Sequence, residues 1–252
     1  MLAHVLEVRR TALYLAPERP LDENTSATFE QLLDAYIDGV PIAYLTGWAD
    51  FWSLRLEITS AVLVPRPDTE ILVASALDLI PSQTDTTVID LGTGSGAVAA
   101  ALAQERPQAF VLASDRSAAA CALAQRNFKR LELPNANAIR ADWMRAIAVG
   151  CGELITANPP YIGLDERPSL DSGLRHEPQD ALFSGRDGLQ DLRIIISAAA
   201  SRLRKDGWLL VEHGYEQGRA VRELFRCHGY ARIETLRDLN QHERVTRGCW
   251  PK

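Results

Sequence analysis

The sequence predicts an α/β fold in which a Rossmann-like sheet of seven strands follows a small N-terminal helical domain and a β-hairpin linker. Three observations predict it. Residues 1 to about 40 lack the alternation of a strand, a glycine-rich loop follows a short apolar segment at 88–91, and strand-like and helix-like segments alternate from Thr69 onward. Such alternation is typical of a mainly parallel sheet with helices on its faces.

The N-terminal region is predicted to be helical because its apolar residues recur at helical spacing. They are Phe29, Leu32, Leu33, Tyr36 and Ile37. Gly39 and Pro41 end this run, since neither residue continues a helix favourably. We therefore assign residues 1–47 to a helical domain.

Residues 48–65 are assigned to a β-hairpin linker and 66–252 to the domain that contains the sheet. Over 51–58 the even-numbered positions are Trp, Leu, Leu and Ile, and they alternate with the odd-numbered ones, as in a strand pair with one buried face. A helix is expected over 69–80, because two prolines fix φ ahead of it and Asp68 or Thr69 offers an N-cap.

Seven strands are predicted for the sheet, most of them separated by helices. They cover 87–91, 110–114, 137–140, 154–157, 208–212, 231–237 and 244–249. A loop rather than a helix separates the last two, so they are expected to pair as a hairpin. This pairing leaves one antiparallel strand in an otherwise parallel sheet.

The composition is that of a globular protein. With 252 residues and 46% hydrophobic residues, the chain has enough material for one sizeable core and an accessory domain. No apolar run approaches the ~20 residues of a membrane span, and the first ten residues lack a signal-peptide core. We therefore expect a cytoplasmic protein. Nothing suggests an obligate dimer, so a monomer is expected.

Charge and cysteine content exclude other classes. A net charge of −6 argues against broad wrapping of duplex nucleic acid, and no direct nucleic-acid binding is expected. Cys121, Cys151, Cys227 and Cys249 are widely spaced without a CxxC pair. This pattern favours reduced thiols over disulfides or a metal site, and we expect no metal.

The glycine-rich loop predicts a nucleotide-like cofactor. A buried strand ends at Leu91, a helix is expected over 97–104, and the loop between them reads Gly92, Thr93, Gly94, Ser95 and Gly96. Asp115 ends the next strand about 20 residues on, where its carboxylate would accept both ribose hydroxyls. By itself such a loop also fits NAD, flavin or a tight turn.

The tetrapeptide Asn158, Pro159, Pro160 and Tyr161 follows the fourth strand and suggests the chemistry. The prolines fix φ and form a rigid platform with outward carbonyls. The Asn158 side-chain oxygen and the Pro159 carbonyl would each accept one N–H of an amide or exocyclic amine, in line with a methyl donor. Tyr161 would lie against the flat substrate group. The alternative is a proline-rich turn with a buried tyrosine.

The chain resembles the HemK/PrmC family of protein-glutamine methyltransferases along nearly its whole length. Besides the loop and the platform, the resemblance is carried by segments 41–47 (Pro-Ile-Ala-Tyr-Leu-Thr-Gly), 51–52 (Phe-Trp), 64–70 (Val-Pro-Arg-Pro-Asp-Thr-Glu), 177–178 (Glu-Pro), 185–189 (Gly-Arg-Asp-Gly-Leu) and 243–248 (Glu-Arg-Val-Thr-Arg-Gly). It implies a class I S-adenosylmethionine-dependent methyltransferase sheet in residues 66–252.

The resemblance implies methyl transfer from S-adenosylmethionine to N5 of the glutamine in the Gly-Gly-Gln motif of class I peptide chain release factors, with S-adenosylhomocysteine as product. It implies that Asn158 to Tyr161 are catalytic. It also implies that the loop residues, Asp115, Asn158, Asp142 and Trp143 bind the cofactor, with Asp142 and Trp143 at the adenine ring. Trp143 packing a loop is the alternative. Asp90 either orients the glycine loop, meets the methionine amino group or caps the turn.

Other positions are open in the sequence. Arg66 and Glu70 either touch the ligand or order the active site, or they only begin a helix, and Phe51 either closes over the cofactor or packs between domains. His213 is expected to be a satisfied surface or rim histidine rather than a base. Relatives usually begin with more helices, so we expect 20–30 missing N-terminal residues by that resemblance.

Two other functions are compatible with the platform. Adenine N6 methylation on DNA or RNA uses a similar nitrogen, but the chain lacks the length of a target-recognition region and a basic arm. A non-catalytic adaptor would have no need of an intact platform at Asn158. The preferred release factor is not encoded in any local pattern.

Overall fold

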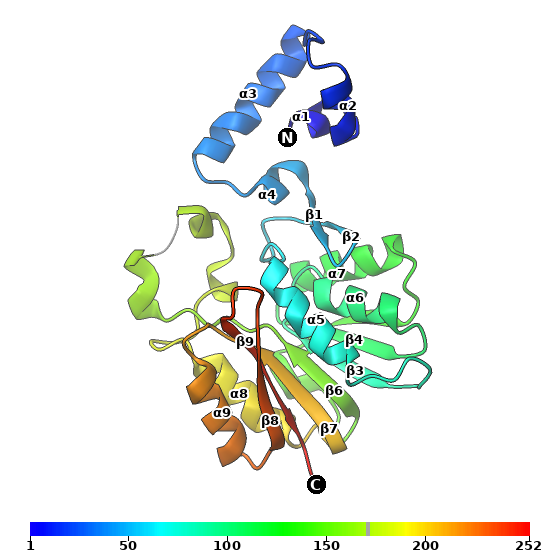
Figure 1. The fold of residues 1–252 in the computed structure, drawn as a ribbon, viewed down its shortest axis with the longest axis vertical. Helices are drawn as coiled ribbons and strands as arrows, with labels where there is room; N and C mark the ends of the chain where they lie inside the picture. The colour runs from blue at the N-terminus through cyan, green and yellow to red at the C-terminus, as the bar shows by residue number, and fades with distance from the viewer. Residues whose placement is uncertain (170–171) are drawn as a thin grey trace.

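The computed structural model describes residues 1–169 and 172–252. Its main sheet has the strand order β5-β4-β3-β6-β7-β9-β8. The strands are β3 (Thr87–Leu91), β4 (Phe110–Asp115), β5 (Ala136–Arg140), β6 (Gly152–Ala157), β7 (Leu203–Glu212), β8 (Ala231–Arg237) and β9 (Glu243–Cys249). Every predicted strand is present, so the predicted seven-stranded α/β fold is confirmed. Figure 1 shows this sheet below the N-terminal helices.

The predicted antiparallel strand is β9, which pairs antiparallel with both β7 and β8, whereas the pairs among β3 to β7 are parallel. β7 begins five residues before the predicted start at 208. Residues 204–206 of this strand are charged, and Asp206 has φ +60°, so the local sequence does not read as a strand. Leu203 nevertheless pairs with Gly152 of β6.

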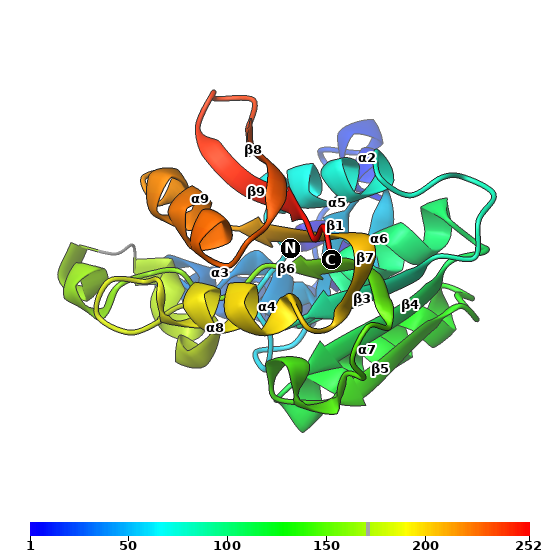
Figure 2. The same cartoon turned by 90° about the horizontal axis from the view of Figure 1, so that it is seen from below.

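Helices cover both faces of the sheet, as Figure 2 illustrates for α6 and α8. One core cluster combines strand residues with side chains of α5 (Glu70–Leu77), α6 (Ala97–Glu105) and α7 (Ala118–Arg130). A second combines the opposite strand faces with α8 (Gln190–Ala199) and α9 (Gly218–Cys227). Val88 belongs to the first and Ile89 to the second, which is the alternation expected of strands buried on both faces.

The predicted linker hairpin is present, with β1 (Trp48–Phe51) antiparallel to β2 (Leu54–Glu57). Its turn is made by Trp52 and Ser53, both at positive φ. Asn127 of α7 holds the hairpin: its Oδ1 accepts from Glu57 N at 2.8 Å and its Nδ2 donates to Glu57 O at 3.0 Å. The same Nδ2 donates to Ser95 O in the glycine loop at 2.9 Å.

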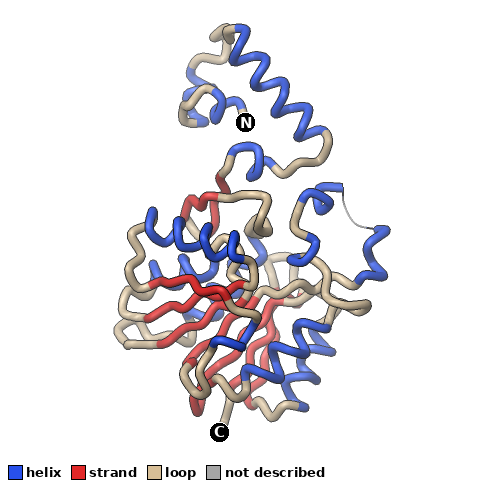
Figure 3. Tube along the Cα trace, turned by 180° about the vertical axis from the view of Figure 1, so that it is seen from behind, coloured by secondary structure: helices blue, strands red, loops and turns tan. Residues whose placement is uncertain are grey.

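The first 47 residues are helical, as predicted, and form four helices. They are α1 (Leu2–Val5), α2 (Arg10–Leu15), α3 (Glu23–Ile37) and α4 (Ile42–Thr46). α3 begins before the apolar run because Asp22 caps it, accepting from Thr25 N at 2.9 Å. These helices lie beyond the hairpin, at the opposite end of the molecule from the C-terminus (Figure 3).

Short 3-10 helices occupy several connections. They are η1 (Pro67–Thr69), η2 (Trp143–Ala146), η3 (Leu164–Ser169), η4 (Ser172–His176) and η5 (Gln179–Ala181). The helix predicted over 69–80 is observed as η1 followed by α5, which ends at Leu77. Within the described part of the chain, no helix has the length and apolar character needed to cross a lipid bilayer.

Candidate functional site

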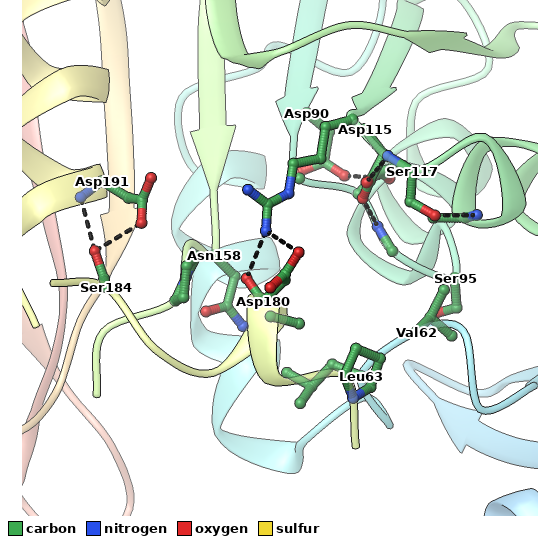
Figure 4. A pocket seen from close by; sticks show the side chains of 18 of the residues that line it. Val62, Leu63, Asp90, Ser95, Asp115, Ser117, Asn158, Asp180, Ser184 and Asp191 are labelled. Carbon is green, nitrogen blue, oxygen red and sulfur yellow. Dashed lines mark hydrogen bonds and ion pairs between the residues drawn. The ribbon is translucent and has the colours of Figure 1, made fainter. Parts of the chain in front are cut away.

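A pocket of about 480 Å³ lies at the carboxyl ends of β3, β4 and β6. This is the edge at which an open parallel sheet binds ligands. Most of the residues predicted to bind a cofactor line it: Gly92, Thr93, Gly94, Ser95, Asp115, Asp142, Trp143 and Asn158. Figure 4 shows Asp90, Asp115 and Asn158 around this pocket.

The glycine loop has a backbone that other residues adopt at a cost. Gly92, Gly94 and Gly96 have φ values of +66°, +55° and +83°. Gly96 is the loop residue that does not line the pocket; a Cβ there would lie 2.7 Å from Cε1 of Phe128. Gly96 therefore shapes the loop by close packing against α7, while its neighbours form the wall.

Two carboxylates, the buried Asp90 and the half-buried Asp115, accept hydrogen bonds from this loop. Asp90, 2% exposed, accepts from Thr93 Oγ1 at 2.6 Å and Thr156 Oγ1 at 2.9 Å. Asp115 accepts from Gly94 N at 3.0 Å through Oδ2 and from Ser117 N at 2.9 Å through Oδ1. Asp90 thus orients the loop, one of the alternatives for it, and burial raises its pKa to about 6. Each Asp115 oxygen keeps acceptor capacity for a ligand.

Trp143 begins η2 and lies against the glycine loop, with its ring within 3.1 Å of the position of a Cβ on Gly92. Its Nε1 donates to Asp191 Oδ1 at 3.1 Å, and Asp191 Oδ2 accepts from Ser184 Oγ at 2.7 Å. Trp143 therefore both lines the pocket and packs against the core. Asp142 forms an ion pair with Arg145 at 3.3 Å.

The Asn-Pro-Pro-Tyr platform separates this pocket from a smaller one of about 160 Å³. Asn158 lines both, Pro160 lines the larger, and Pro159 and Tyr161 line the smaller. Asn158 Nδ2 donates to Thr69 Oγ1 at 3.1 Å. Burial raises the pKa of Tyr161 to about 12, so its phenol is neutral at ordinary pH.

The four residues whose roles the sequence leaves undecided have different surroundings in the structure. Arg66 lines both pockets and pairs with the buried Glu177. Glu70 instead accepts from Trp52 N at 3.0 Å and so fixes the hairpin turn. Phe51 is 2% exposed and packs in the core. His213 is not at the surface or rim: it is fully buried, and its Nε2 lies 2.8 Å from Thr246 Oγ1.

Sequence reasoning missed several residues of the site. Thr69 and Glu212 lie beside Asn158, and Arg116 contacts Asp180 at 2.8 Å across the larger pocket. Segment 178–185 supplies much of the wall. The Glu-Pro at 177–178 is one of the segments that carry the family resemblance, but no local periodicity indicates that the segment lines the pocket.

Comparisons with known proteins cover nearly the whole chain. The PrmC N-terminal domain model matches residues 1–47, and the Methyltransferase small domain model matches residues 68–185. Release factor glutamine methyltransferases from Xylella fastidiosa, Pseudomonas aeruginosa and Escherichia coli are 42%, 44% and 43% identical to it. The matches cover 100%, 99% and 98% of this chain and 91%, 90% and 89% of those proteins.

Solved structures with little sequence similarity share the fold. The hMettl16 catalytic domain has a TM-score of 0.65 at 16% identity, with 93% of this chain and 95% of that chain covered. A methyltransferase from Pyrococcus furiosus has a TM-score of 0.60 at 14% identity, with 92% and 100% covered. These structures show a methyltransferase fold independently of the sequence relatives.

Proposed function

This chain belongs to the family of release factor glutamine methyltransferases, and we propose that it methylates N5 of the glutamine in the Gly-Gly-Gln motif of class I peptide chain release factors. S-adenosylmethionine is the methyl donor, and S-adenosylhomocysteine is the product. The observation that carries the proposal is the position of Asn158 on the walls of two adjoining pockets. One pocket suits the cofactor and the other a narrow side chain.

The larger pocket fits the cofactor in its donors and shape. The glycine loop approaches without side chains at Gly92 and Gly94, the Asp115 carboxylate suits the ribose hydroxyls, and Trp143 offers a flat face to adenine. When bound there, S-adenosylmethionine supplies an electrophilic methyl group. Thr93 and Ser95 line the same wall, and Gly96 acts indirectly by shaping the loop.

The platform orients the substrate amide. An amide nitrogen is a poor nucleophile because its lone pair is delocalised, so alignment is the main contribution that the protein makes. Asn158 Nδ2 is engaged by Thr69, which leaves Oδ1 for one substrate N–H, and the Pro159 carbonyl accepts the other. Pro160 keeps this backbone rigid, and the neutral Tyr161 ring shapes the slot. The nitrogen loses one proton to solvent on methylation.

Domain roles follow from the same proposal. Residues 1–47 form the N-terminal helical domain, 48–65 the linker and 66–252 the catalytic domain. The match of 1–47 to the PrmC N-terminal domain model supports the first of these. We further propose a cytoplasmic monomer that binds no nucleic acid directly, since its substrate is a protein and its net charge is −6.

The test is label transfer from methyl-labelled S-adenosylmethionine to a class I release factor, compared with a factor whose Gly-Gly-Gln glutamine is alanine. Label is expected only in the first. Asn158→Ala should lower turnover at least about 100-fold, because the amide is no longer aligned, while cofactor affinity is kept.

Asn137→Ala, at an exposed position on the edge strand β5, is the matched control and should methylate normally. Label in both release factors, or unchanged turnover in Asn158→Ala, would contradict the proposal. Label in an adenine-containing oligonucleotide instead of the factor would favour the adenine alternative, for which the structure offers no specific observation.

A further inference from the structure

Glu212 ends β7 next to the platform and is buried without full hydrogen bonding. It is 2% exposed, and in the described part of the chain its Oε2 has no hydrogen-bond partner. An unpartnered buried carboxylate oxygen is destabilising, and native proteins keep few such groups outside functional sites. Glu212 also lines the smaller pocket together with Asn158 and Tyr161.

Sheet topology brings Glu212 to this position. β6 and β7 are parallel neighbours, and Ala157 pairs with Val211. The next residue of each strand, Asn158 and Glu212, therefore leaves the sheet at the same level. Thr69 reaches the same point from the start of α5.

These three side chains lie together at this edge of the sheet, and Asn158 and Glu212 line the same smaller pocket. Asn158 Nδ2 donates to Thr69 Oγ1 at 3.1 Å. Burial raises the pKa of Glu212 to about 7, and the neighbouring polar side chains of Thr69 and Asn158 oppose that rise. An ionised carboxylate only accepts, so an ionised Glu212 favours a Thr69 hydroxyl that turns its proton toward Glu212 and accepts from Asn158.

The direction of the hydrogen bond to Thr69 determines which end of the Asn158 amide faces the substrate. An asparagine side chain turned by 180° exchanges its donor and acceptor ends with almost no change in shape. With Glu212 ionised, Thr69 and Glu212 both favour the donor end of Asn158, so Oδ1 is the end left for the substrate. A protonated Glu212 can donate to Thr69, which then donates to Oδ1 of a turned amide, leaving an NH2 group toward the substrate.

We propose that Glu212, acting with Thr69, is a positioning residue for the methyl transfer because it holds Asn158 with Oδ1 toward the substrate nitrogen. The inference rests on the proposed function, since Asn158 is the acceptor for the substrate amide there. It adds a residue that lines the smaller pocket and acts through Asn158 rather than on the reacting atoms.

Other charged groups face Glu212 and influence it. Arg244 of β9 favours its ionised form and Asp68 of η1 disfavours it. Tyr161 is neutral, and Arg66 lines the same pocket. His213, its neighbour in the chain, interacts with Thr246, and burial lowers its pKa, so it stays neutral. None of these groups replaces Glu212 as the acceptor behind Asn158 and Thr69 among the described contacts.

The first measurement needs no turnover. In the ¹⁵N-labelled full chain, the Asn158 side-chain NH2 signal, identified by its loss in Asn158→Asp, is followed across neutral pH. A shift with a midpoint near 7 is expected in the native protein and not in Glu212→Gln. Glu153→Gln on β6, an acid paired with Arg204 away from the pocket, should keep the shift.

The second measurement is methyl transfer to the release factor. Native kcat should fall as pH drops through about 7, when Glu212 becomes protonated. Glu212→Gln should lower kcat about 10-fold to 100-fold at alkaline pH, remove this pH step and leave S-adenosylhomocysteine affinity unchanged. Thr69→Ser should retain most activity, whereas Thr69→Val should resemble Glu212→Gln.

The stability of Glu212→Gln distinguishes a positioning role of Glu212 from a purely structural one. The folded-state pKa of Glu212 lies above its ordinary value of 4.5, so the folded protein loses stability as pH rises and the buried group ionises. Glu212→Gln removes this cost, and its melting temperature at alkaline pH should not fall. A lower melting temperature with an unchanged pH profile would assign Glu212 to structure alone.

An unchanged kcat and pH step in Glu212→Gln, or an Asn158 signal that does not titrate, overturns the inference. If the native protein labels no release factor but the Asn158 signal titrates through Glu212, the positioning of Asn158 is supported and the proposed substrate is wrong. The two failures are therefore distinguishable.

Discussion

The N-terminal helices and the sheet-forming part of the chain are stabilised in different ways. No residue of α1, α2 or α3, all of which the structure describes, is buried, whereas seven of the nine residues of α6 are. Some apolar side chains of the first region are largely exposed, among them Leu15 at 86% and Ile37 at 71%. The sheet domain carries its own core, and helical periodicity alone does not reveal which helices contribute to one.

The largest expected effect is in the core. Phe128→Ala should lower the free energy of unfolding by about 3–5 kcal/mol, because Phe128 of α7 is fully buried in the core and its ring packs against the glycine loop. Phe29→Ala in α3, where the ring is half-buried, should cost much less, about 1–2 kcal/mol. Chemical denaturation of both variants measures the difference. Equal losses would remove the contrast between the two regions.

A smaller effect is expected from replacing two glycines that share a positive φ. Gly96→Ala should cost about 2–4 kcal/mol and weaken cofactor binding, since its Cβ would meet Phe128 at 2.7 Å and its φ is +83°. Gly47→Ala, at φ +78° with nothing within 4 Å, should cost only about 1–2 kcal/mol.

Calorimetry and cofactor titration distinguish these two glycines. In the double variant Gly96→Ala/Phe128→Ala, the loss should be less than the sum of the single losses, because the smaller side chain leaves room for the new methyl group. Strict additivity would show that the contact with Phe128 is not what requires glycine.

The smallest effect is expected at the N-terminal surface. Ile37→Ser should change the free energy of unfolding by no more than about 0.5 kcal/mol, because the side chain is 71% exposed. The same substitution at Ile195 in α8, which is fully buried, is the matched control and should be severely destabilising. Thermal unfolding of both compares them directly; a marked loss in Ile37→Ser would mean that this helix is packed after all.

Much of the fold was predictable because its signals are local. Strand segments such as 87–91 and 231–237 were predicted with their observed bounds, and the glycine loop and platform lie at the predicted edge of the sheet. The start of β7 was missed because charged residues at 204–206 hide a strand that pairs with β6.

The rest of the site depends on contacts between distant segments. Thr69 and Asn158 are 89 residues apart, and no periodicity links them. His213 read as a surface or rim residue because the sequence does not show that Thr246 of β9 lies beside it. Glu70 follows the Pro-Arg-Pro segment that borders the pocket, yet its carboxylate turns to the hairpin.

Asn127 gives the linker and the cofactor loop a common strut. Its amide is fully buried and forms hydrogen bonds with both segments, with Glu57 on the hairpin and with Ser95 on the loop. Moving the hairpin away would leave the buried Asn127 amide without its hydrogen-bond partners on Glu57, at a cost of about 1–3 kcal/mol. Any swing of the N-terminal helices relative to the sheet therefore has its pivot before Glu57, nearer to Gly47, and leaves the floor of the cofactor pocket still.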